Sequence, residues 1–329
     1  MPGDYVLPLT VPEPHRRPLI VRLRNWVGDT TLGVPLLQRL DDAGYALQLV
    51  GKGWARDLLA AHGWPVHVQP DKLPDRVALL RRLKAEALRL DDHFAGRTNA
   101  LCLPYSFSSA LDMRLAGLRS LGHAHEGRSP LLSRAVARPR GVHELQVYWD
   151  LGNQLLAQHQ PAPAQIGLRV SQGHEQQADA LLQIHGIRPG FIVICPFAGG
   201  TWSKQDKTWP AFAPFAAAVL NRFGRDVVIC PGPGEEAIAR EHFATAMTLP
   251  NVGLGAYAAL LKRAALMIAN DTGPGHIAAA VGTPLISVLG PSDPAQWRAW
   301  GANVRLLQGP EGWPPAEAVE HAVAQALTP

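Results

Sequence analysis

The sequence predicts an α/β protein with two doubly wound parallel sheets, one after the other along the chain. Apolar runs of strand length alternate with amphipathic helical segments twice, and the Pro- and Ala-rich run 160–167 separates the two series. Strands that alternate with helices in this way form parallel sheets with helices on both faces. At 329 residues, the chain is long enough for two domains of ordinary size.

The first series begins after a Pro-rich stretch of 18 residues. Its leucines recur at helical spacing over 28–44, and Gly44 closes that helix. The run 126–141 interrupts the alternation with four arginines, no lysine and one acid. We predict strands over 18–25, 45–52, 66–69 and 98–104, and helices over 28–44, 55–63, 74–91, 107–118 and 143–158.

The second series restarts the alternation after the linker. We predict strands over 191–197, 226–232, 266–270, 284–290 and 304–309, and helices over 210–224, 235–246, 274–282 and 315–327. The expected domains are therefore 1–165 and 166–312, with a closing helix in 313–329. Two such domains face each other across a cleft, and their ligands bind beyond the carboxyl ends of the strands.

Composition and charge exclude several classes of protein. The longest apolar runs are too short to span a bilayer, and the first residues lack the apolar core of a signal peptide. The three cysteines form no CxxC pair, which favours a reducing cytosol.

The net charge is +4, and residues 1–165 carry 20 basic against 15 acidic side chains. The first domain is thus the better candidate to meet an anionic partner, although a solvated surface explains this excess equally well.

The segment 266–301 carries the strongest functional pattern. A buried strand ends before Asp271, Thr272 and Gly273, and a helix begins there with a proline in its first turn. The unpaired N–H groups and the dipole of such a helix start favour an anion, and His276 in the first turn is a further donor. In the structural alternative, Asp271 and Thr272 only cap the helix.

A second strand-to-helix connection, 196–210, is rich in hydrogen-bond donors. Thr201 and Ser203 offer hydroxyl groups and Lys207 offers a cation, which suits a diphosphate bound without a metal. The P-loop pattern is absent, and the alternative is a solvated basic loop. No metal site is expected, because the 13 histidines are dispersed and neither HExxH nor DxD occurs.

Three carboxylates lie at other strand-to-helix turns. Asp29 follows a glycine at the first turn, where it either caps the helix or projects into the cleft as a general base. Glu235 and Glu236 lie at the start of a later helix. There they either interact favourably with the helix dipole or accept hydrogen bonds from ribose hydroxyls.

Three of these segments together resemble family 9 glycosyltransferases, the ADP-heptose:lipopolysaccharide heptosyltransferases. They are RLRNWVGDTTLGVPLL, the KTWP run and NDTGPGHIAAAVGTPLISVLGPSDPAQW, in the family's order and at fitting separations. The run SFSSALDMRLAGLRSLGHAHEGRSPLLSRA is more similar to the heptosyltransferase II branch than to the I branch.

The resemblance implies a GT-B fold, with the acceptor on the first domain, the nucleotide-sugar on the second, and the last helix packed back on the first. It implies Asp29 as catalytic base, Glu235 or Glu236 near the ribose, and Arg128 and Arg134 near an anionic lipopolysaccharide-core acceptor. For the donor, it implies contacts with Thr201, Ser203, Lys207, Asp271, Thr272, Gly273 and His276.

The same resemblance implies an inverting transfer of heptose from ADP-heptose without a metal or other cofactor. The protein would be cytoplasmic, would contact the inner membrane peripherally, and would have no nucleic-acid partner. The alternatives are a family member with a different donor or acceptor, and a nucleotide-sugar-binding protein without catalytic activity.

Overall fold

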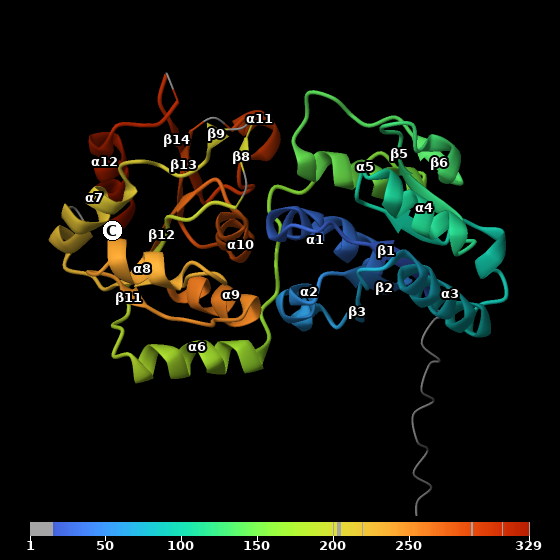
Figure 1. Ribbon diagram of the computed structural model, residues 1–329, viewed down its shortest axis with the longest axis horizontal. Helices are drawn as coiled ribbons and strands as arrows, with labels where there is room; N and C mark the ends of the chain where they lie inside the picture. Colours follow the sequence, from blue (N-terminus) through green and yellow to red (C-terminus); the bar gives the residue numbers. More distant parts are fainter. Residues whose placement is uncertain are drawn as a thin grey trace, which may run out of the picture.

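The structure is a computed structural model that describes residues 16–199, 201–202, 205–218, 220–290, 292–310 and 312–328. These residues form two lobes side by side, each built around a six-stranded parallel sheet with helices on both faces (Figure 1). The predicted fold class is confirmed.

The first sheet has the strand order β3-β2-β1-β4-β5-β6. Its central strand is β1, whose Leu19, Ile20 and Val21 are completely buried because helices cover both faces of the sheet. Its strands are β1 (Arg17–Arg22), β2 (Tyr45–Gly51), β3 (Val66–Val68), β4 (Ala100–Cys102), β5 (Ser120–His123) and β6 (Arg134–Val136). Its helices are α1 (Val27–Asp42), α2 (Trp54–Leu58), α3 (Leu73–Leu90), α4 (Phe107–Leu115) and α5 (Glu144–Leu156).

The second sheet repeats this order as β11-β10-β7-β12-β13-β14. Its strands are β7 (Ile192–Cys195), β10 (Val227–Ile229), β11 (Met247–Thr248), β12 (Leu266–Asn270), β13 (Leu285–Leu289) and β14 (Val304–Gln308). Its helices are α6 (Gln172–Ile184), α7 (Phe212–Ala218), α8 (Glu236–His242), α9 (Leu254–Arg263), α10 (Gly273–Val281), α11 (Pro294–Trp297) and α12 (Ala316–Leu327). A short antiparallel pair, β8 (Thr201–Trp202) and β9 (Gln205–Asp206), lies between β7 and α7.

The two lobes share a continuous hydrophobic core. Helix α1 of the first lobe packs against both α5 and α10, so it lies between its own lobe and the second one (Figure 1). The linker is tied down on both sides, because Gln38 donates a hydrogen bond to the carbonyl of Gly167 and Trp300 donates one to that of Pro163. The helix starts of α1 and α10 are thereby held together where the lobes meet.

Several elements were absent from the sequence-based prediction. Strand β5 has a single large aliphatic side chain, Leu121, and β6 is an edge strand with exposed Arg134 and Ala135. Neither shows the apolar run that indicates a strand, so the arginine-rich interruption in fact contains the last strand of the first sheet. Helices α6 and α9 pack against each other on the outside of the second lobe.

The last helix differs from the expectation that it returns to the first domain. The apolar face of α12, formed by Val319, Ala322 and Val323, is buried in the core of the second lobe with Ile286 and Val288 of β13. Figure 1 shows α12 at the side of the second lobe farthest from the first. Burial of this face removes apolar surface from water without any crossing between lobes.

Among the described residues, no helix has the length and apolar character needed to cross a membrane. The cysteines Cys102, Cys195 and Cys230 are all free. The described part of the chain also contains no group of three or more His, Cys, Asp or Glu side chains that could hold a metal ion.

Candidate active site

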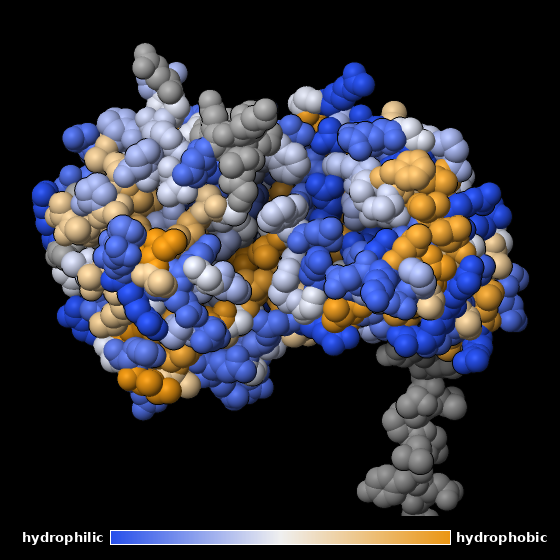
Figure 2. Space-filling view, in the orientation of Figure 1, coloured by the Kyte–Doolittle hydropathy of each residue, from blue (hydrophilic) through white to orange (hydrophobic). Residues whose placement is uncertain are grey.

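A cavity of about 460 Å³ opens where the two lobes meet. Both lobes contribute to its lining, and Figure 2 shows the hollow between them. The lining residues from the first lobe are Arg24, Trp26, Val27, Gly28, Asp29 and Leu32, and those from the second are Gly199, Lys207, Asp271, Thr272, Gly273, Pro274, His276 and Trp297.

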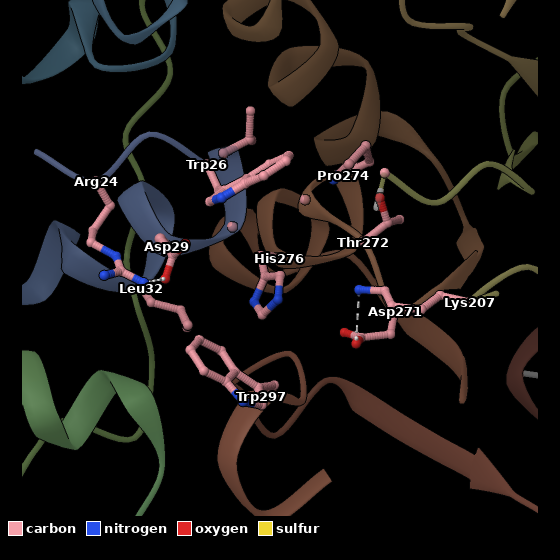
Figure 3. Close-up of a pocket in the computed structure, with 14 residues that line it drawn as sticks. Arg24, Trp26, Asp29, Leu32, Lys207, Asp271, Thr272, Pro274, His276 and Trp297 are labelled. Atoms are coloured by element: carbon pink, nitrogen blue, oxygen red, sulfur yellow. Dashed lines mark hydrogen bonds and ion pairs between the residues drawn. The ribbon is translucent and has the colours of Figure 1, made fainter. Parts of the chain in front are cut away.

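The cavity forms at the carboxyl ends of two central strands. The turn from β1 to α1 places Asp29 on one side, and the turn from β12 to α10 places Asp271 on the other, with His276 between them (Figure 3). Two glycines allow the helix starts to approach this closely. A Cβ atom on Gly28 would come within 2.7 Å of the His276 ring, and one on Gly273 within 2.9 Å of Val27 Cβ.

The carboxylate of Asp29 is held through one of its oxygens. The Tyr148 hydroxyl donates to Asp29 Oδ1 at 2.7 Å, and an Arg24 guanidinium nitrogen lies 3.4 Å from the same oxygen. The Asp29 side chain is only 9% exposed, yet it lines the cavity. The structural alternative for Asp29 was a side-chain cap of α1, but the cap position is Trp26, which makes no such bond.

A cation and a helix start face Asp29 across the cavity. Lys207 Nζ lies 3.3 Å from Asp271 Oδ2, and both side chains are largely buried. The segment that follows Lys207 is tied to the end of β12, because the backbone N–H of Trp209 donates to the Asn270 side chain. Thr272 caps α10 without a side-chain hydrogen bond. Pro274 has no N–H and the Gly275 N–H donates to the Thr272 carbonyl, so this helix start offers an anion the Gly273 N–H and the positive end of the helix dipole.

His276 and Gly273 contribute to the packing between the lobes in addition to their predicted donor contacts. Burial lowers the pKa of His276, although Asp271 and Asp29 partly offset the effect, so the ring is neutral at pH 7. The missing side chain of Gly273 leaves room for Val27 of α1, so this glycine serves the contact between the lobes in addition to the donor contact predicted for it. Both residues nevertheless line the cavity.

The two glutamates predicted near the ribose lie outside the cavity lining. Glu235 follows β10 and accepts a hydrogen bond from the backbone N–H of Gly232 at 2.8 Å. Glu236 is the first residue of α8 and is half-buried. Thr201 lies in β8, just before the strand that leads to Lys207, and Ser203 lies outside the described residues.

The two arginines predicted to contact the acceptor do not line the main cavity. Arg128 is completely buried, and its guanidinium donates to the carbonyls of His123 and Pro104, so it braces a loop inside the first lobe. Arg134 lies on the edge strand β6 and donates to the carbonyl and side chain of Gln154. Burial makes Arg128 inaccessible to an acceptor, whereas Arg134 is exposed and its contact with an acceptor stays a prediction.

Other basic residues of the same segment do line a cavity. This second cavity, of about 530 Å³, lies at the carboxyl ends of β5 and β6 and is lined by Ala124, His125, Ala137, Arg138 and Arg140. The ring of Tyr105 links the two cavities, since the Arg138 guanidinium lies 5.0 Å from its centroid and that of Arg24 lies 4.5 Å from it. We call the site lined by these five residues the basic pocket.

Sequence reasoning missed four residues at or behind the main cavity. Arg24 and Trp26 precede Asp29 in the run RNWVGD, and Trp297 ends the run DPAQW, so all three were within recognised segments. Tyr148 lies 119 residues from Asp29 and carries no local signal. Only the packing of α5 against α1 brings its hydroxyl to the carboxylate.

Two Rossmann-like lobes that face each other across such a cavity define the GT-B architecture. The model of glycosyltransferase family 9 (heptosyltransferase) matches residues 93–325, and the chain belongs to this family. The family match begins after the segment that contains Asp29 and includes the segments with Lys207 and Asp271.

Curated relatives are all lipopolysaccharide heptosyltransferases. Type 3 from Escherichia coli is 34% identical over 134 residues, which is 36% of either chain, so that alignment spans about a third of the relative's length. Type 2 from E. coli K12 is 26% identical over 294 residues, 82% of either chain.

Solved structures share the fold over nearly the whole chain. The ADP-heptose lipopolysaccharide heptosyltransferase II of E. coli has a TM-score of 0.78 at 22% identity and covers 94% of this chain and 98% of its own. A family 9 glycosyltransferase of Veillonella parvula has a TM-score of 0.79 at 18% identity, with coverage of 94% and 97%.

Proposed function

We propose that this protein transfers heptose from ADP-heptose to an acceptor in the inner core of lipopolysaccharide, with inversion and without a metal. One observation carries the proposal: a single cavity brings a carboxylate of the first lobe, Asp29, opposite a cation and a helix start of the second, Lys207 and α10. The names of its relatives supply the sugar and the acceptor class.

The reaction is a single displacement. The acceptor hydroxyl attacks the anomeric carbon from the side opposite ADP, and its proton passes to Asp29 as the new C–O bond forms. The bond from the anomeric carbon to the phosphate oxygen breaks, and its electron pair leaves with ADP. Lys207, the Gly273 N–H and the dipole of α10 stabilise the negative charge that develops on the diphosphate, which is the role a metal has in other transferases.

The basic pocket suits the anionic groups of the acceptor. It places His125, Arg138 and Arg140 at the same sheet edge as Asp29, one aromatic ring away from Arg24. Arg138 is oriented by an ion pair with the buried carboxylate of Glu144 at 2.7 Å. A phosphate or carboxylate held here would leave a neighbouring sugar hydroxyl free to reach Asp29.

The function is tested by incubating the purified protein with ADP-heptose, an inner-core acceptor and EDTA. We expect ADP release that depends on the acceptor, and a product whose anomeric configuration by NMR is opposite to that of the donor. An acceptor stripped of its anionic groups should have a higher KM. Release of ADP only from another nucleotide sugar would replace the donor, and binding without turnover would indicate a non-catalytic protein.

Replacing Lys207 with Ala should weaken ADP binding by about 10- to 100-fold, because a charge-assisted contact with the diphosphate contributes about 1.5–3 kcal/mol. Titration calorimetry with ADP measures this directly. Lys262→Ala is the matched control, since Lys262 forms a surface ion pair with Glu175 in the same lobe, away from the cavity. Equal ADP affinity in wild type and Lys207→Ala would remove the lysine from the donor site.

We also propose that the protein is cytoplasmic and contacts the inner membrane through α4. Phe107, Leu111 and Leu115 lie at i, i+4 and i+8 on this helix, and Phe107 and Leu115 are 49% and 44% exposed. Figure 2 shows apolar side chains over α4. Arg81 and Lys84 of α3 donate to the carbonyls of residues 115 and 117, so cations flank the apolar stripe as in interfacial helices.

Co-sedimentation with vesicles that contain anionic phospholipid tests this contact. We expect the double variant Phe107→Ser with Leu115→Ser to bind several-fold less than wild type, since burial of two large side chains is lost. Ile184→Ser is the control, because Ile184 is 77% exposed on α6 of the other lobe. The proposal fails if wild type does not sediment with the vesicles, or if the control loses as much binding.

A further inference from the structure

The hydroxyl of Tyr148 is the closest hydrogen-bond donor to Asp29 among the described residues. It lies 2.7 Å from Asp29 Oδ1, and Arg24 lies 3.4 Å from the same atom. Among the described residues, none donates a hydrogen bond to Oδ2. The two oxygens of the carboxylate are therefore unequal: Oδ1 accepts from Tyr148 and is the oxygen nearest to Arg24, whereas Oδ2 accepts no such bond while the side chain lines the cavity.

Tyr148 is itself rigidly placed. Its side chain is completely buried on the face of α5 that packs against α1. At Gly152 the two helices approach so closely that a Cβ atom would lie 2.8 Å from a Leu36 methyl group. One turn away, Arg39 of α1 donates to Asn153 of α5 at 2.8 Å. The phenol is thus presented to Asp29 from a helix that is locked to the one carrying Asp29.

The environment also fixes the protonation of the phenol. Burial raises the pKa of Tyr148 well above its usual value, and the nearby negative charge of Asp29 acts in the same direction. The hydroxyl therefore keeps its proton throughout the working pH range and acts only as a donor toward Oδ1. It cannot exchange roles with the carboxylate and accept the substrate's proton.

We propose that Tyr148 is a positioning residue for the transfer reaction: with Arg24 it restrains Oδ1 of Asp29, so that Oδ2 faces the cavity as the atom that takes the proton. The inference rests on the proposed function of Asp29 as base. During the displacement, the acceptor O–H bond breaks toward Oδ2 while the oxygen bonds to the anomeric carbon and ADP departs. Without the phenol, the carboxylate can rotate and lose its alignment with the acceptor hydroxyl.

The test compares the kinetics and the stability of Tyr148→Phe with those of wild type. We expect kcat to fall by about 10- to 100-fold, as misplacement of a reacting group does, with KM for both substrates and ADP affinity within about twofold. A purely structural role would instead lower the denaturation midpoint and change KM together with kcat, and an unchanged kcat would overturn the proposal.

Three further variants complete the design. Tyr45→Phe is the matched control, a buried tyrosine at the amino end of β2, on the sheet edge opposite the cavity. In an Asp29→Asn background, Tyr148→Phe should cause no further fall in kcat. If Tyr148→Phe lowers kcat by the same factor in this background as in wild type, the proposal is overturned. If Tyr148→Phe does not fold, Arg24→Gln removes the other restraint on Oδ1 and should lower kcat more than it changes KM.

Failure of the proposed function and failure of this inference give different results. If wild type fails to transfer heptose, the proposed function is wrong, and crystal structures of wild type and Tyr148→Phe still test the restraint. The Asp29 carboxylate should have one orientation in wild type and more than one in Tyr148→Phe, and the same single orientation in both overturns the inference. If wild type turns over and Tyr148→Phe matches it in kcat, only the inference falls.

Discussion

Asp29→Asn should lower kcat by at least about 100-fold, because an asparagine cannot accept the proton of the acceptor hydroxyl as the sugar is transferred. The amide keeps the size of the carboxylate and its Oδ1 can still accept the hydrogen bond from Tyr148, so the lobes and the cavity should remain intact. ADP contacts residues of the other lobe in the proposed reaction, so its affinity should be nearly unchanged. Single-turnover assays and calorimetry measure the two quantities separately.

Asp42→Asn is the matched control for this variant. Asp42 is the last residue of the same helix, α1, and it is exposed at the end away from the cavity. It should retain wild-type turnover. If Asp29→Asn retains wild-type turnover as well, another group takes the proton, and the assignment of Asp29 as base is wrong.

Acidification should destabilise the protein through two histidines at the junction of the lobes. Burial lowers the pKa of His62 and of His143 to about 4. Both must be neutral, because His62 Nε2 accepts from the backbone N–H of Arg169, and His143 Nδ1 accepts from that of Leu145. His143 Nε2 in turn donates to the carbonyl of Arg298 in the second lobe.

The direction of the effect follows from linkage. The unfolded chain binds a proton at each histidine near pH 6.5, while the folded chain resists protonation until about pH 4, so stability is present above pH 6.5 and is lost as the pH falls. From pH 7 to pH 5 this amounts to about 2 kcal/mol of unfolding free energy for each histidine. Urea denaturation at the two pH values measures the total.

His143→Asn isolates one of the two contributions. Asparagine is a good helix cap and does not titrate, so the variant should keep the start of α5 while losing about 2 kcal/mol of the pH dependence. A wild-type urea midpoint that is the same at pH 7 and pH 5 would contradict the assignment of neutral, buried rings at the lobe junction.

The candidate site was predictable wherever a short segment carries the whole signal. Asp29, Lys207 and Asp271 each follow a buried strand, within a few residues of a glycine or proline that marks the turn into a helix. The carboxyl ends of parallel strands meet at one edge of a sheet, so these residues could be assigned to a common cleft before any contact was known. All three line the same cavity.

The prediction failed where residue type alone does not tell whether a side chain is buried or which way it points. Arg128 and Arg138 belong to one arginine-rich run, yet the first is buried against backbone carbonyls and the second lines the basic pocket. Arg128 precedes β6 and Arg138 follows it, so the path of the backbone on either side of this strand, and not residue type, decides which arginine is internal. The destination of α12 was also undetermined, because an amphipathic helix fits any apolar surface of matching shape.

The amino-acid sequence by itself determined the α/β class, the two series of strands and the turns that carry Asp29, Lys207 and Asp271, because strand and helix periodicity and turn chemistry are local. Tertiary structure alone decided that Tyr148 meets Asp29, that Gly28 and Gly273 serve the contact between α1 and α10, and that Arg128 is internal. Those relations join residues far apart in the chain, and they arise from the packing of whole helices rather than from any local pattern.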